Sequence, residues 1–464
     1  MSANASGPQL ERTIGLVGAV ALVIGGVIGA GIYALIGSIG AKAGYATWLA
    51  FLIAMFASIA GAIPVIQVAS SMPRAGAGYL FTSRLLFPLA GTVSSGLILL
   101  AGASSTALTI VALTTYLPPS LTFGVPLHLV GIGILIVFYL IMLCGLQLAM
   151  GLQVIMVAQM LVALGIYALA GLYHTPLEFS TVPRQGAGQF FMAVVLCYNA
   201  CMGFQVLAEM GEEIHHPKRT IPLALLIGGV VVTLIYISVG MVLVNSLPYT
   251  AENYDPDNAP INASALLFLP ASVVAFINFG SLTAGLTSLN AAAVALPREL
   301  FAQSRDGILP AALSRVGARS HAPLAATSTF FGLLIFMVFL NMDQDFYGLT
   351  AALGIQMITS AMCIASLRLP RKYPKLYREA YVVFPVWLLW LCTIASILTT
   401  ILFGVIVAME RSSVVVVYAT LAVALAIYHL VRVAHLRRNA FPYDARVQAI
   451  PGSDDPEDQI DVPH

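Results

Sequence analysis

Residues 25–31 read Gly-Gly-Val-Ile-Gly-Ala-Gly, and they lie inside an apolar segment that runs from about Ile14 to Ile39. Each glycine weakens a helix by roughly 1 kcal/mol relative to alanine. Four glycines in these seven residues therefore predict an unwound stretch in the middle of the segment. Unwound backbone at membrane depth is tolerated only where it is buried in protein or lines a water-filled cavity. The stretch predicts a binding site of main-chain groups halfway across a membrane.

The composition indicates an integral membrane protein. The chain is 59% hydrophobic and 9% charged, whereas soluble domains are roughly 45–50% apolar and about 25% charged. The net charge is +1, and no basic stripe suggests a nucleic-acid partner. The first residues are polar and the first apolar segment is too long for a signal peptide, so we expect no cleavable one. The five cysteines lack metal-ligand spacing and are expected to be buried apolar side chains.

Twelve apolar segments are long enough to cross a bilayer, which takes about 20 residues in a helix. They cover residues 14–39, 46–71, 88–116, 127–146, 151–172, 189–211, 222–247, 271–297, 323–341, 347–367, 383–408 and 413–434. No separator is long enough for a soluble catalytic domain. The composition of residues 435–464 predicts a disordered tail on the same side as the N-terminal residues 1–12.

The distribution of basic residues supports this count. If the N-terminus is cytoplasmic and the segments alternate, only Lys42, Arg184 and Arg411 of the 21 Lys and Arg residues fall outside. A miscounted segment would scramble this bias. The positive-inside rule therefore predicts twelve spans of a cell membrane, with both termini in the cytoplasm.

The sixth segment is interrupted as well. Its centre reads Tyr198-Asn199-Ala200-Cys201-Met202-Gly203-Phe204-Gln205, and Asn and Gly are poor helix formers. Interrupted segments at corresponding places in two halves point to a transporter site. We therefore predict an all-α fold of two inverted five-helix units, residues 13–172 and 189–367, with two more spans in residues 383–434. The alternative is that the glycines only allow close helix packing, since Gly25 and Gly29 form a GxxxG motif.

Four motifs, in order and at suitable spacing, resemble those of the amino acid–polyamine–organocation permeases. They are Gly29-Ala30-Gly31-Ile32-Tyr33; Pro73-Arg74-Ala75-Gly76-Ala77-Gly78-Tyr79; Gly203-Phe204 followed by Glu212-Glu213-Ile214-His215-His216-Pro217-Lys218-Arg219-Thr220-Ile221-Pro222; and Arg305-Asp306-Gly307-Ile308-Leu309-Pro310. The resemblance covers nearly the whole chain. It implies the inverted-repeat fold of the bacterial leucine transporter and secondary transport of amino acids by alternating access. We find neither a catalytic constellation nor a phosphate-binding GxxxxGK[ST] loop, so neither an enzyme nor an ATP-driven pump is expected.

The resemblance also implies a substrate site. N–H groups at the start of a half-helix carry partial positive charge and suit a carboxylate. The resemblance places the substrate carboxylate at Ala30 and Gly31, the ammonium group at carbonyls of Val27, Asn199 and Met202, and the side chain at Tyr198, Cys201 and Phe204, with Gly29 and Gly203 as the backbone breaks. Alternatively, the aromatic pair packs or gates, and the cysteine is an inert filler. No charged side chain lies clearly in this pocket, which favours neutral amino acids.

A coupling-ion site follows from the same resemblance. Ala284-Gly285-Leu286-Thr287-Ser288 resembles the sodium-ligating stretch of the leucine transporter group. Ala284, Thr287 and Ser288 would bind Na⁺ together with the carbonyls of Gly25 and Ile28, an all-oxygen set that suits a hard cation. The alternative is that both hydroxyls bond back to carbonyls four residues earlier.

Segment five bears on the choice of coupling ion. Many proton-coupled relatives carry a lysine there, whereas this chain reads Val157-Ala158-Gln159-Met160. Na⁺ coupling is therefore favoured. Proton coupling through an acid such as Glu209 or ion-independent exchange of amino acids or amines is the alternative, and a non-transporting amino acid sensor is a further one. Glu209 lies either at membrane depth, where acids are functional candidates, or in the cytoplasmic loop after segment six, which Glu212 and Glu213 favour.

The remaining expectations concern loops. Arg74, Arg298 and Arg305 are expected to pair with Glu212, Glu213, Glu299 or Asp306 near a cytoplasmic gate. Light chains of heteromeric exchangers use a cysteine between the third and fourth segments to bind a partner chain. The corresponding residues 117–126 contain none, so the expected partners are an amino acid and membrane lipid, without a disulfide-linked heavy chain.

Overall fold

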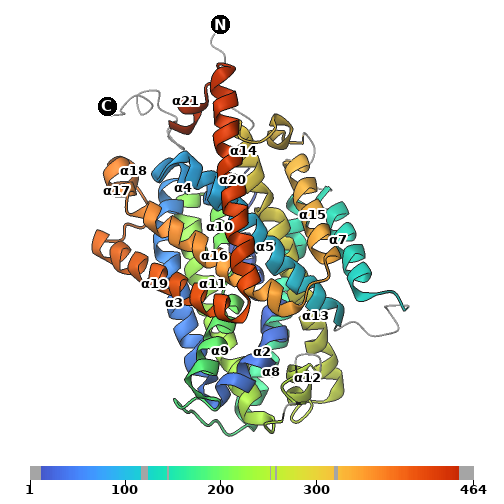
Figure 1. Cartoon of the computed structure of the whole chain (residues 1–464). Coiled ribbons are helices and arrows are strands. Elements are labelled where there is room, and N and C mark those ends of the chain that lie inside the picture. Colours follow the sequence, from blue (N-terminus) through green and yellow to red (C-terminus); the bar gives the residue numbers. More distant parts are fainter. Residues whose placement is uncertain are drawn as a thin grey trace.

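The computed structural model describes residues 12–115, 124–143, 146–250, 252–255, 259–317 and 322–448, which form a bundle of helices (Figure 1). β-Pairing in this part of the chain is limited to two isolated bridges, Ile14 with Ile214 and Ala75 with Met210. The all-α prediction is confirmed. Predictions on residues 1–11 and 449–464, on Cys144 and on most of the loop 117–126 fall outside the described residues.

The helices, in chain order, are α1 (Leu16–Val27), α2 (Ala30–Ala43), α3 (Thr47–Ser71), α4 (Ala77–Leu85), α5 (Pro88–Thr115), α7 (Leu127–Leu143), α8 (Leu146–His174), α9 (Gly186–Ala200), α10 (Gln205–Glu209), α11 (Pro217–Ser246), α12 (Pro260–Ala265), α13 (Ala271–Ala295), α14 (Pro297–Arg305), α15 (Leu324–Phe339), α16 (Gln344–Ser366), α17 (Leu369–Lys372), α18 (Pro374–Arg378), α19 (Val386–Glu410), α20 (Ser412–Arg438) and α21 (Tyr443–Gln448).

Each predicted segment contains one helix or a pair of short helices. The first is divided into α1 and α2, and the sixth into α9 and α10. Among the described residues, eight helical stretches are long and apolar enough to cross a membrane. One of them, Leu35–Ser71, runs from α2 into α3 through a short 3₁₀ helix, Gly44–Ala46. α1, α7, α9 and α15 are shorter apolar helices. The chain is a multi-pass membrane protein, while the number of twelve spans stays a prediction.

The broken segments lie at the centre of the bundle. α1 packs against α8, α11 and α13, and α9 packs against α2 and α3. In the predicted repeat, α1 corresponds to α9, α3 to α11, α5 to α13 and α8 to α16. The contact of α1 with α11 then matches that of α9 with α3, and the contact of α8 with α13 matches that of α16 with α5. Such matched pairs agree with two inverted five-helix units, which remain a prediction.

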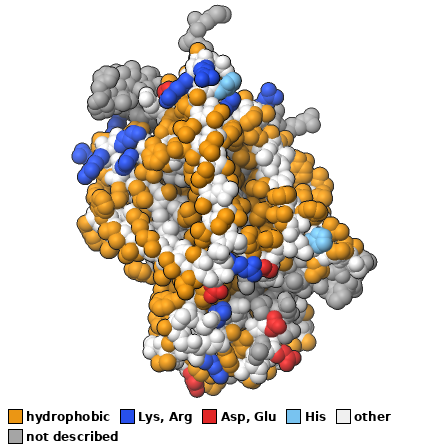
Figure 2. Space-filling view, in the orientation of Figure 1, with side chains coloured by type: hydrophobic (Ala, Val, Ile, Leu, Met, Phe, Trp, Pro, Cys, Tyr) orange, Lys and Arg blue, Asp and Glu red, His pale blue; other side chains and the backbone are white. Residues whose placement is uncertain are grey.

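The outer surface is apolar and its two ends differ in charge. α19 and α20 expose large apolar side chains such as Trp387, Leu398 and Ile427, as expected of helices that face lipid. Figure 2 shows Lys and Arg concentrated at the upper end of the molecule. There the chain carries Arg371, Lys372, Lys375, Arg378, Arg437 and Arg438 on α17, α18 and the last turn of α20. We refer to this as the basic end.

Candidate functional site

The break in the first segment is short. Ile28 leaves α1 with a ψ of 85°, and extended Gly29 precedes α2. The Gly29 N–H donates to the Val27 carbonyl at 3.0 Å. Gly29 provides no side chain to cap α2, so the first-turn N–H groups, including those of Ala30 and Gly31, form the positive end of a helix dipole. The backbone leaves the helix at Ile28 and Gly29, a narrower break than the predicted one.

Two glycines, Gly29 in the break and Gly25 in the last turn of α1, permit close helix contacts. A Cβ atom on Gly29 would collide with Ser288 Oγ of α13 and lie 3.0 Å from Ser288 Cβ. A Cβ atom on Gly25 would collide with Gln153 Nε2 of α8 and lie 2.9 Å from Thr287 Cβ. These glycines therefore serve packing in addition to weakening the helix.

The second break lies directly against the first. The residues between α9 and α10 include Gly203, whose φ of +124° is strained for any residue with a side chain. A Cβ atom on Gly203 would collide with the Gly26 carbonyl and lie 2.9 Å from Val27 N. The structure thus brings the two predicted breaks, far apart in sequence, into backbone contact.

A buried tyrosine joins the two breaks. The hydroxyl of Tyr236, in α11, lies 2.9 Å from the Val27 carbonyl and 2.9 Å from the Ala200 carbonyl. A hydroxyl carries one proton, so it donates to one of these carbonyls at a time. Each carbonyl also has two lone pairs, and Val27 retains acceptor capacity for a ligand.

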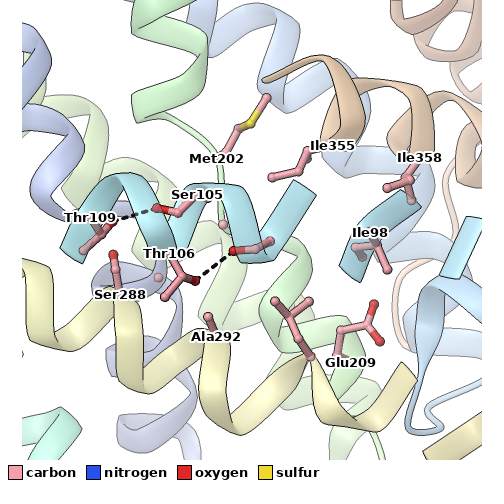
Figure 3. A pocket seen from close by; sticks show the side chains of 14 residues that line it. Ile98, Ser105, Thr106, Thr109, Met202, Glu209, Ser288, Ala292, Ile355 and Ile358 are labelled. Carbon is pink, nitrogen blue, oxygen red and sulfur yellow. Dashed lines mark hydrogen bonds between the residues drawn. The ribbon is translucent and has the colours of Figure 1, made fainter. Parts of the chain in front are cut away.

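A cavity, which we refer to as the main cavity, lies against both breaks. Gly26, Met202 and Gly203 supply the wall on the side of the breaks. Figure 3 shows the cavity between α5, α13 and α16, with Ser288 and Thr109 at one end and Glu209 at the other. The remaining wall combines the hydroxyls of Ser105 and Thr106 with the apolar side chains of Ile98, Leu296, Ile355 and Ile358.

The predicted side-chain contacts divide between two cavities. Met202 lines the main cavity and also a smaller one, which Tyr198 and Phe204 line with Ser58 of α3. The Tyr198 hydroxyl donates to the Gln356 side chain of α16. Cys201 is buried, and its carbonyl accepts a hydrogen bond from Ser58 at 3.3 Å. Asn199 lies in the last turn of α9, where its carbonyl accepts from the Met202 N–H at 3.3 Å.

The five predicted cation ligands contain two hydrogen-bonded pairs. Ser288 Oγ donates to the Gly25 carbonyl at 3.0 Å, which joins α13 to α1. Thr287 Oγ1 donates to the Ala284 carbonyl within its own helix at 2.8 Å. The set consists of oxygen atoms only, and rotating each hydroxyl proton away would leave these oxygens as acceptors. The residues therefore fit a hard cation, and Ser288 does not bond back within its helix.

Comparison with known proteins identifies the family. A family model described as "Amino acid permease" matches residues 14–431, most of the chain. The chain belongs to the amino acid permease family. It is a transporter and not an enzyme.

Three relatives show the range of this similarity. The permease is 25% identical over 406 residues to the branched-chain amino acid permease BcaP of Bacillus subtilis (strain 168), covering 82% of this chain and 85% of that protein. It is 27% identical over 362 residues to cationic amino acid transporter 4 of Homo sapiens, covering 73% of this chain and 56% of the human protein. It is 23% identical over 346 residues to the methylthioribose transporter of Bacillus subtilis, covering 70% and 74% respectively.

Ion pairs of the permease join α14 to the residues that follow α10. Arg298 pairs with Glu213 at 2.6 Å, Arg305 pairs with Glu212 at 2.8 Å, and Arg74 lies 3.9 Å from Glu212. Asp306 pairs instead with Arg84, at 2.7 Å. Backbone bonds from the N–H groups of residues 13 and 14 to the Glu213 carbonyl tie the start of the chain to the same segment. The three arginines therefore pair with acids, as predicted, while Glu299 bonds to no arginine among the described residues.

Glu209 corrects one prediction. The sequence favoured a loop position, but Glu209 is the last residue of α10, fully buried, and lines the main cavity of the permease. α10 continues past the break for only five residues, so the carboxyl group remains inside the bundle.

Two amides beside the predicted cation site went unnoticed in the sequence. Gln153 of α8 donates to the Ala21 carbonyl at 3.2 Å and accepts from Asn290 of α13 at 2.8 Å. Both side chains are fully buried. Gln153 lies one turn before the predicted stretch that begins at Val157. Polar residues inside apolar segments, here Gln153 and Asn290, were the available signal.

Proposed function

We propose that this permease carries neutral amino acids across the cell membrane by alternating access, through twelve spans with both termini in the cytoplasm. The cavity that touches Gly26 and Gly203 carries this proposal, because it lies against both interrupted helices. Non-helical backbone at membrane depth is tolerated where it lines such a cavity.

The substrate carboxylate would bind the first-turn N–H groups of α2, at Ala30 and Gly31. The ammonium group would bind carbonyls of Val27, Asn199 and Met202. The substrate side chain would extend along the apolar wall formed by α5, α13 and α16, or toward the smaller cavity beside Tyr198, Cys201 and Phe204. The apolar wall and the name of the branched-chain relative support aliphatic substrates.

Cationic amino acids are the second candidate. Glu209 places one carboxyl group in the cavity wall, and several relatives are named cationic amino acid transporters. This carboxyl group already accepts backbone hydrogen bonds, which favours the neutral class.

For the coupling ion, we propose Na⁺ held by Gly25, Ile28, Ala284, Thr287 and Ser288. The bond from Ser288 to Gly25 supports this proposal, since it holds oxygens of α13 and α1 within contact distance at the break. Ion binding there would link the position of α1 to that of α13, next to the proposed substrate contacts.

Purified permease in liposomes tests both proposals. Uptake of labelled leucine, isoleucine, lysine and glutamate is measured with Na⁺ or with choline at the same pH. We expect saturable uptake and counterflow of the aliphatic substrates, with the rate reduced in choline. Substrate binding without uptake would support the sensor alternative. Faster lysine uptake would support the cationic class, and equal rates in choline would refute Na⁺ coupling.

A glycine pair provides the structural control. Gly203→Ala forces a Cβ atom against the Gly26 carbonyl, so we expect loss of uptake. Gly165→Ala, in α8, meets no atom within 4 Å and is expected to leave uptake unchanged. Equal activity of the two variants would refute a role for the contact between the breaks.

A further inference from the structure

Two buried carboxyl groups meet at the end of the main cavity that lies farthest from Ser288. Glu209 ends α10, and Glu299 lies in the first turn of α14; both side chains are fully buried. Only Glu209 lines the cavity (Figure 3). Along α5 the lining runs from Thr109 to Ile98, a helical distance of about 16 Å, so the pair is remote from the proposed substrate and cation contacts.

Both carboxyl groups bind the same helix start. Glu209 accepts from the N–H groups of Ala77 at 2.7 Å and Gly78 at 3.2 Å. Glu299 accepts from the N–H groups of Gly78 at 2.7 Å and Tyr79 at 3.0 Å. The Gly78 N–H therefore faces one oxygen of each carboxyl group. A Cβ atom on Gly78 would lie 2.8 Å from Glu299 Oε1, so glycine leaves room for this approach.

The two carboxyl groups lie close to each other, since the Gly78 nitrogen is 3.2 Å from Glu209 Oε1 and 2.7 Å from Glu299 Oε1. Two ionised carboxylates have no proton to donate, so a hydrogen bond between these groups requires that one of them is protonated. Two like charges in a buried site also repel each other, and such carboxyl pairs hold a proton between them.

The cations near the pair are committed to other acids. Arg298 binds Glu213, and Arg305 binds Glu212, which Arg74 also approaches. Arg84 binds Asp306, to which the Tyr79 hydroxyl also donates. Lys218 and Arg219, at the start of α11, are exposed. The other helices that pack against α10 or α14, namely α1, α3, α5, α13 and α15, contain no charged residue.

We propose that Glu209 and Glu299 bind one shared proton, and that this proton controls the separation of α10 from α14 at the basic end. With the proton bound, the two groups share it and hold α10 against α14 and α4. When the proton leaves to water, two charged carboxylates remain in contact, and their repulsion favours the movement of α10 that connects the cavity to the basic end. This inference rests on the proposed transport function and does not depend on whether Na⁺ binds.

Infrared spectroscopy of the purified permease tests for the proton directly. We expect the C=O stretch of a protonated carboxylic acid near neutral pH, shifted in deuterium oxide and absent from both Glu209→Gln and Glu299→Gln. Glu379→Gln, an exposed acid, is the matched control and should keep the band. A wild-type protein without this band, or a band that survives both substitutions, would overturn the proposal.

Transport measurements test the coupling. In liposomes at constant Na⁺, wild-type uptake should change with pH by up to about tenfold per pH unit, the limit for one titrating proton. Uptake should also fall when a protonophore removes the proton gradient. Glu299→Gln, whose side chain does not line the cavity, should retain counterflow but lose the pH dependence, which a merely structural role would not remove. Glu209→Gln should lose the same pH dependence. Retained pH dependence in both variants would overturn the inference, whereas absence of any amino acid counterflow in the wild type would refute the proposed function instead.

Discussion

Gly29→Ala probes how closely α13 approaches the first break. The φ of Gly29 is −107°, which alanine adopts without strain. The new Cβ atom would collide with Ser288 Oγ, so the hydroxyl would have to rotate and release the Gly25 carbonyl. A lost hydrogen bond that leaves a buried acceptor unpaired costs about 1–3 kcal/mol. We expect the free energy of unfolding to fall by about 2 kcal/mol.

A double-mutant cycle with Ser288→Ala isolates this clash. Ser288→Ala removes the colliding oxygen. The Cβ atom of residue 288 then lies 3.0 Å from the Cβ atom that Gly29→Ala adds, a contact that small shifts relieve. Gly29→Ala should therefore cost roughly 1 kcal/mol less in the Ser288→Ala background, within the usual range of coupling between contacting residues.

Chemical unfolding in detergent, followed by tryptophan fluorescence, measures the four free energies of unfolding. Gly165→Ala serves as the control for a glycine substitution that meets no atom. If the cost of Gly29→Ala is the same with and without the Ser288 hydroxyl, the close approach is not the reason for glycine at this position. In that case, any difference in leucine affinity among the same four proteins would reflect only local backbone effects.

Three further substitutions test other contacts. Tyr236→Phe removes the hydroxyl between the two breaks, so we expect a loss of about 1–3 kcal/mol in unfolding free energy and slower uptake, measured side by side. Arg298→Ala leaves a buried carboxylate unpaired and should lower the free energy of unfolding by about 3–5 kcal/mol. The more exposed Arg305→Ala should lower it by at most about 1 kcal/mol. Equal losses in the two variants would contradict this prediction. Asp343 caps α16, and although partial burial opposes it, the Phe346 N–H and Arg411 lower the pKa of its carboxyl group. The stabilisation by ionised Asp343 is therefore present above the unfolded pKa of about 3.9 and is lost as the pH falls through the lower folded pKa. Asp343→Asn should abolish this acid sensitivity in melting experiments. Asp343→Ala should cost about 1 kcal/mol more through loss of the cap.

Local chemistry made the helices and both breaks predictable. Hydropathy located every long helix, because a chain in lipid must satisfy its backbone hydrogen bonds within helices or closed barrels. Glycine weakens a helix wherever it lies, so the interruptions near Gly29 and Gly203 could be predicted without knowledge of any neighbour. The predicted width of the first break was too large, since α2 resumes at Ala30.

Residues of the cavity were harder to predict, because their roles depend on partners far away in sequence. Ile355 and Thr109 look like ordinary apolar-helix residues until α16 and α5 pack together beside the breaks. Gln153 is one amide in an apolar helix until Asn290 lies next to it. Glu209 resembled a loop residue, since two more glutamates follow it in the sequence.

The sequence by itself determined that this permease spans a membrane, where its helices lie and where two of them break. These properties follow from hydropathy and glycine content, which act through each residue's own backbone and its transfer into lipid. Only the tertiary structure decided that Gly203 lies against Gly26, that Ser288 reaches the Gly25 carbonyl and that Glu209 and Glu299 approach the same Gly78 N–H. Each of these contacts joins residues from separate helices, and only helix packing brings them within hydrogen-bonding or van der Waals distance.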